Sequence, residues 1–138
     1  MMGDATSRTG RTLAWVGVVL GLAGLILQFS LSIPEVMSQG RTFLASIELY
    51  FSYFTILSNS ALVLVYYAVA RGPGVGAMAA LRGPTVRAGM AAVMLFVCGF
   101  FHIVLAPTLN PQGWWMVADV TLHYAAPLFY ALCWLVFA

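Results

Sequence analysis

Four long apolar segments dominate this sequence, and each is close to the length that crosses a lipid bilayer. They cover residues 13–33, 46–70, 88–106 and 117–138. Because no water reaches the bilayer core, a spanning segment must satisfy its own backbone hydrogen bonds, which predicts a helix for each. We therefore expect an all-α fold, an integral membrane bundle of four transmembrane helices that forms a single domain over residues 13–138.

The composition also indicates a chain that lies in lipid. Charged residues make up 7% of the 138 residues, whereas a soluble domain has about 25%. The formal net charge of +2 is too small for a nucleic-acid-binding surface, so no nucleic acid partner is expected. No P-loop, dinucleotide-binding turn or zinc-type cysteine cluster is present, and we expect neither a cofactor nor a metal. Membrane lipids are the predicted partners, and the oligomeric state stays open.

The arginine residues predict how the helices are oriented. Five of the six precede the first segment or separate the second from the third: Arg8, Arg11, Arg71, Arg82 and Arg87. Only Arg41 falls in a loop on the other side, after Pro34, which is expected to end the first helix. The positive-inside rule then gives a multi-pass protein of the cell membrane, with residues 1–12 as a cytoplasmic segment.

Polar side chains recur inside the second apolar segment. Glu48, Ser52, Thr55 and Asn59 are four, three and four residues apart, which would place them on one face of a single helix. Polar groups in hydrocarbon are costly unless they pair with one another or line a cavity. This spacing therefore predicts a polar pocket within the bundle.

The depths of the polar groups place this pocket in the outer half of the bilayer. With a rise of about 1.5 Å per residue, Thr55 is predicted roughly 12–14 Å below the outer surface, His102 about 6 Å and His123 about 9 Å. Gln28 and Ser32, one turn apart in the first segment, fall in the same half. We expect these groups to converge.

A threonine and a histidine together can support acyl transfer. The Thr55 hydroxyl becomes a nucleophile when a base such as the His123 imidazole takes its proton. Asn59 could supply an oxyanion donor, and Asp119, one turn before His123, could fix the imidazole tautomer or simply favour the helix dipole. The supporting candidates are the other polar groups of these segments: His102, Asn59, Asp119, Ser52 and Glu48.

Two other functions fit the same residues. His102 and His123 lie on neighbouring antiparallel segments at similar depth, as paired axial ligands of a haem would. Alternatively, the chain is a non-catalytic scaffold or transporter subunit, in which hydroxyls bond carbonyls one turn back and amides join helices.

Two short motifs carry a resemblance to a known family. The stretches 53–59 (YFTILSN) and 122–128 (LHYAAPL), with 101–106 (FHIVLA), resemble the bacterial branch of the androgen-induced-gene and androgen-dependent TFPI-regulating-protein family. The resemblance implies a multi-span membrane hydrolase with Thr55 as nucleophile and His123 as its partner, acting on lipid esters such as fatty acid esters of hydroxy fatty acids. That family usually has about six spans, so four spans are compatible with a truncated member.

Overall fold

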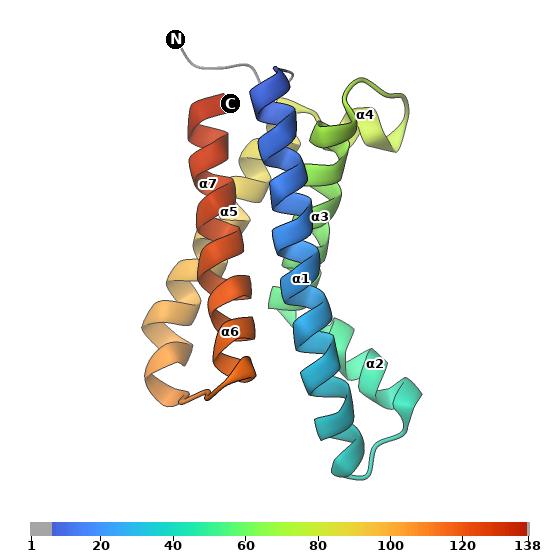
Figure 1. Ribbon diagram of the computed structural model, residues 1–138, viewed down its shortest axis with the longest axis vertical. Helices are drawn as coiled ribbons and strands as arrows, with labels where there is room; N and C mark the ends of the chain where they lie inside the picture. Colours follow the sequence, from blue (N-terminus) through green and yellow to red (C-terminus); the bar gives the residue numbers. More distant parts are fainter. Residues whose placement is uncertain (1–6, 138) are drawn as a thin grey trace.

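The computed structural model describes residues 7–137, which form a bundle of helices without a strand (Figure 1). Within this range the α-helices are α1 (Arg8–Ser38), α2 (Phe43–Ser52), α3 (Phe54–Arg71), α4 (Ala77–Leu81), α5 (Pro84–Phe100), α6 (Trp114–Val120) and α7 (Ala126–Phe137). Four stretches are long and apolar enough to cross a membrane: Arg8–Ser38, Phe54–Arg71, Pro84–Thr108 and Trp114–Phe137. The predicted all-α fold with four such helices is confirmed.

Helix α1 organises the bundle because it packs against elements from both halves of the chain. It contacts α2 and α3 from the first half of the chain, and α6 and α7 from the second half. Helix α5 packs against α7 on the other side, as Figure 1 shows. Gly17 and Gly21, one turn apart, permit the close approach of α1 to α3, since a Cβ atom at either position would collide with Tyr66 or Val63.

The first helix is longer than predicted at both ends. It begins at Arg8, inside the predicted N-terminal segment 1–12, so that residues 8–12 are helical; residues 1–6 lie outside the described part of the chain. It also continues through Pro34 to Ser38, so the prediction that Pro34 ends it is wrong. A proline removes one backbone donor. Here the neighbouring Ile33 is buried in a cluster with α2 and α3, and that packing holds the turn in place.

The second predicted helix, residues 46–70, is two helices. Helix α2 ends at Ser52 and α3 begins at Phe54, with Tyr53 between them in an extended conformation (φ −74°, ψ 129°). The Tyr50 hydroxyl donates to the Leu25 carbonyl of α1 at 2.6 Å, which holds α2 against α1. Glu48 and Ser52 therefore do not share a helix face with Thr55 and Asn59, and the single-face prediction is wrong.

The last two spans each contain one wide turn. The third runs over Pro84–Thr108 and the fourth over Trp114–Phe137, close to the predicted ranges, although residue 138 lies outside the described part. A π-helical turn interrupts the third span at Phe101–Leu105 and the fourth at Thr121–Ala125. Such turns insert one extra residue into a helix and are frequent at functional sites. Both histidines of the chain lie in these two turns.

Candidate functional site

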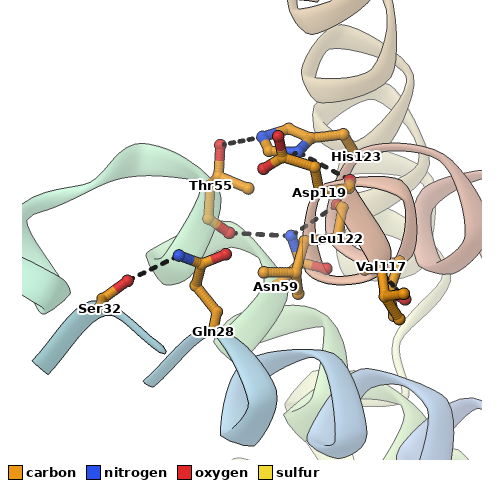
Figure 2. A network of polar contacts seen from close by, with 9 residues as sticks. Gln28, Ser32, Thr55, Asn59, Val117, Asp119, Leu122 and His123 are labelled. Carbon is orange, nitrogen blue, oxygen red and sulfur yellow. Dashed lines mark hydrogen bonds and ion pairs between the residues drawn. The ribbon is translucent and has the colours of Figure 1, made fainter. Parts of the chain in front are cut away.

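Thr55 and His123 meet at the junction of α3 with the fourth span. Thr55 lies in the first turn of α3, directly after the break at Tyr53, and His123 lies in the π-helical turn Thr121–Ala125. The Thr55 Oγ1 atom is 3.3 Å from Nε2 of His123 (Figure 2). Residues 68 positions apart are thus within reach of a hydrogen bond, at a distance somewhat longer than the optimum.

The second nitrogen of His123 fixes the orientation of the imidazole. Nδ1 lies 3.0 Å from the backbone carbonyl oxygen of Asp119, one turn earlier. A carbonyl oxygen can only accept a hydrogen bond, so Nδ1 carries the proton. In the neutral ring Nε2 is then an acceptor, and it faces the Thr55 hydroxyl. The Asp119 carboxylate is further away, with Oδ1 3.9 Å from Nδ1.

Phe101 holds the face of the same imidazole. The two rings are stacked with centroids 3.7 Å apart and planes inclined by 15°. Phe101 is only 5% exposed and begins the π-helical turn of the third span. Because a stacked ring resists rotation of its neighbour, Phe101 adds to the Asp119 carbonyl in directing Nε2 toward Thr55.

Asn59 connects the backbone at Thr55 with the backbone next to His123. Its Nδ2 donates to the carbonyl of Thr55 at 2.9 Å and to that of Leu122 at 3.1 Å (Figure 2). The side chain is fully buried, so these bonds form in a medium without competing water. Both amide hydrogens are used in this way, which leaves Asn59 as a link between α3 and the fourth span, not as an oxyanion donor.

A cavity of about 420 Å³ lies beside the Thr55–His123 pair. This volume falls within the range of small-molecule pockets, roughly 300–1,000 Å³. Its walls come from α1, the α2–α3 junction and the last two spans: Gln28, Ser32, Glu35, Val36, Gln39, Leu49, Tyr50, Tyr53, Thr55, Ile56, Phe101, Leu105, Leu109, Trp115, Asp119, Leu122 and His123. The exposed residues among them lie at three places, which together form the open side of the cavity: Glu35 and Gln39 near the end of α1, Tyr53 between α2 and α3, and Leu105, Leu109 and Trp115 around the loop that joins the last two spans.

Three predicted site residues lie elsewhere. The Ser52 hydroxyl is exposed and donates to the Leu49 carbonyl at 2.6 Å, and Glu48 is exposed on α2. His102 is exposed too, with Nδ1 3.0 Å from the Tyr124 hydroxyl, and does not line the cavity. The haem alternative needs His102 and His123 to face one space, whereas His123 points to Thr55 and has Phe101 stacked on its ring.

The sequence did not identify the apolar and aromatic walls of the cavity. Phe101 and Trp115 line the cavity. In a sequence, aromatic residues of apolar segments are usually interpreted as lipid contacts, so they gave no indication of a cavity wall. The polar wall on α1 had a detectable signal, because Gln28, Ser32 and Glu35 are four and three residues apart. That spacing predicts a common helix face, which turns out to border the cavity.

The fold and site define a class, an α-helical membrane bundle with a threonine–histidine pair beside a cavity. Comparisons of this chain with protein-family models, with curated proteins and with solved structures found no match.

Proposed function

We propose that this chain is an integral membrane hydrolase of lipid esters, with Thr55 as nucleophile and His123 as general base. The observation that carries the proposal is the approach of Thr55 Oγ1 to His123 Nε2, 3.3 Å, on the wall of a cavity large enough for part of a lipid. The resemblance of residues 53–59 and 122–128 to a family of membrane hydrolases supports the same two roles.

The proposed reaction proceeds in two steps through an acyl-threonine. The Thr55 oxygen attacks the ester carbonyl carbon while its proton passes to His123 Nε2. The tetrahedral intermediate then breaks the bond to the alcohol oxygen, which takes the proton from His123 and leaves. Water next attacks the acyl-threonine, again with His123 as base, and the fatty acid is released. The Asp119 carbonyl and carboxylate near Nδ1 favour the transient imidazolium.

The start of α3 supplies the donors for the oxyanion. The first-turn amides of a helix have no partner inside the helix, and Tyr53, the residue before α3, provides no side-chain cap. Amide groups at Thr55 and Ile56 are therefore available beside the nucleophile, with the positive end of the helix dipole behind them. This arrangement replaces the role that the sequence suggested for Asn59.

Replacing His123 with glutamine tests the base. We expect turnover of a lipid ester to fall by about a hundredfold to a thousandfold, because glutamine can hold a hydrogen bond but cannot take a proton from Thr55. Ester hydrolysis is measured as fatty acid release by purified protein in detergent micelles. His102→Gln is the matched control, since its imidazole lies outside the cavity, and it should retain turnover. Equal losses in both variants, or none in His123→Gln, would contradict the assignment.

We further propose that the chain crosses the cell membrane with its arginine-rich end in the cytoplasm. Arg11 donates to the carbonyls of Ala70 and Arg71, and Arg87 lies beside Phe137, so the start of α1 and the ends of α3 and α7 share one end of the bundle. The cavity opens at the opposite end, which then faces the outer leaflet.

Labelling of single cysteines in intact cells tests this orientation. A cysteine-free variant carrying Arg41→Cys should react with a membrane-impermeant maleimide, because Arg41 is exposed in the loop between α1 and α2. Val75→Cys, exposed in the loop after α3, should react only after the cells are lysed. The reverse pattern would show an inverted bundle.

A further inference from the structure

We infer that the cavity binds the alcohol part of the ester through hydroxyl groups, so that the substrate is a fatty acyl ester of a small neutral polyol such as glycerol. This inference rests on the proposed function and names its substrate class. It is carried by the wall that α1 contributes opposite Thr55, and by the charges around the cavity.

The α1 wall is a row of four polar side chains. Gln28, Ser32, Glu35 and Gln39 are spaced four, three and four residues apart, and all line the cavity. Gln28 and Ser32 are half-buried and lie near Thr55 in Figure 2, whereas Glu35 and Gln39 are exposed near the end of α1. The row thus leads from the nucleophile to the mouth of the cavity.

The side chains of this row already pair with one another and still have groups to offer. Gln28 Nε2 donates to Ser32 Oγ at 2.6 Å, and Gln39 Nε2 donates to Glu35 Oε1 at 3.1 Å. These bonds leave the Gln28 carbonyl, the Ser32 hydroxyl proton and a second Glu35 oxygen for a ligand. A row that presents both hydrogen-bond donors and acceptors matches hydroxyl groups, because each hydroxyl can donate and accept a hydrogen bond. An ammonium group would need acceptors alone.

The charges around the cavity argue against an acidic alcohol part. Among the described residues that line it, the charged side chains are Glu35 and Asp119, both acidic, and there is no arginine. A hydroxy fatty acid would bring a free carboxylate close to these two acidic side chains without a cation to pair with, and like charges repel one another. The structure therefore favours a neutral polyol ester over the hydroxy fatty acid ester that the family resemblance implies.

The reaction requires no component beyond water. The acyl group passes from the polyol oxygen to Thr55, the polyol leaves with the proton held by His123, and water releases the fatty acid. The apolar wall of the cavity, with Leu105, Leu109 and Trp115, lies on the side of the last two spans and suits the acyl chain.

Competing esters with the same acyl chain test the inference. Purified protein in detergent micelles is given 1-oleoylglycerol, methyl oleate, or the oleoyl ester of 12-hydroxystearic acid, and kcat/KM is compared. We expect the glycerol ester to be preferred over each of the others by about tenfold or more, as one or two hydrogen bonds would give. In Ser32→Ala, and more so in Gln28→Met/Ser32→Ala, this ratio should fall toward one. Ser30→Ala is the matched control: Ser30 is exposed on the same helix, bonds the Ile26 carbonyl and does not line the cavity.

A binding measurement separates this inference from the proposed hydrolysis. Trp115 lines the cavity, so its fluorescence should report the ether analogue 1-O-octadecylglycerol, which cannot be cleaved; Trp115→Phe identifies the signal. We expect this glycerol ether to bind at least about tenfold more tightly than octadecyl methyl ether, and its affinity to fall in Ser32→Ala but not in Ser30→Ala. That result supports the polyol site even if no ester is hydrolysed. A lack of hydrolysis would overturn only the proposal that the chain is a hydrolase. Equal binding of the two ethers, or preferred cleavage of methyl oleate or the hydroxystearate ester, would overturn the polyol inference. Thr55-dependent hydrolysis would remain compatible with either of these results.

Discussion

Replacing Thr55 with valine should abolish ester hydrolysis and leave the bundle folded. Valine has nearly the shape of threonine but lacks the hydroxyl that is 3.3 Å from His123 Nε2. Because the remaining residues cannot form an acyl intermediate, we expect kcat to fall by about a thousandfold or more. A fluorophosphonate probe should label the wild-type chain, and this labelling should disappear in Thr55→Val.

Two further variants separate catalysis from packing. Thr55→Ser keeps the hydroxyl and should retain both labelling and measurable turnover. Thr121→Val is the matched control, because the Thr121 hydroxyl donates to the Val117 carbonyl one turn back at 2.7 Å and does not line the cavity. If Thr55→Val keeps wild-type turnover, or Thr121→Val loses as much, then the hydroxyl of Thr55 is a helix-to-helix contact and its assignment as the nucleophile is wrong.

The fold class could be predicted because the requirement to bury backbone polar groups in lipid leaves few alternatives. Long apolar stretches therefore gave the number of spanning helices and their approximate ranges. The exceptions were local. Pro34 continues a helix because tertiary packing around Ile33 compensates for a lost bond, and the break at Tyr53 has no proline or glycine to mark it. Hydropathy reports burial in lipid and does not resolve such interruptions.

The candidate site could be predicted only where the residue type was itself unusual in hydrocarbon. Thr55 and His123 were selected for that reason, and the structure brings them together; their catalytic roles stay predictions. Glu48 was misplaced because its assignment to the site assumed one continuous helix. The stacking of Phe101 on His123 depends on π-helical turns in two different spans. No periodicity in the sequence specifies an extra residue in a turn, so this contact required coordinates.

Adding a side chain at Gly17 should destabilise the whole bundle, because Gly17 lies where α1 packs directly against Tyr66 of α3. A Cβ atom on Gly17 would collide with the ring of Tyr66. That ring is 3% exposed and packs edge-on against Tyr130, with centroids 5.3 Å apart, so it has little freedom to move aside. Gly17→Ala should therefore cost about 1–3 kcal/mol, and Gly17→Leu more.

Gly89 on α5 provides the matched control for this substitution. Nothing lies within 4 Å of a Cβ atom built there, so Gly89→Ala should leave stability unchanged or raise it by up to about 1 kcal/mol, the helix propensity gained over glycine. Thermal unfolding in detergent micelles is followed by circular dichroism. The midpoint temperature should be several degrees below that of the wild type in Gly17→Ala, and should not be lowered in Gly89→Ala. Equal midpoints for the two variants would mean that α1 and α3 are not held at this separation. The link from α1 to the Thr55 turn would then be looser as well, since α3 carries Thr55 and α1 carries the polar wall that faces it.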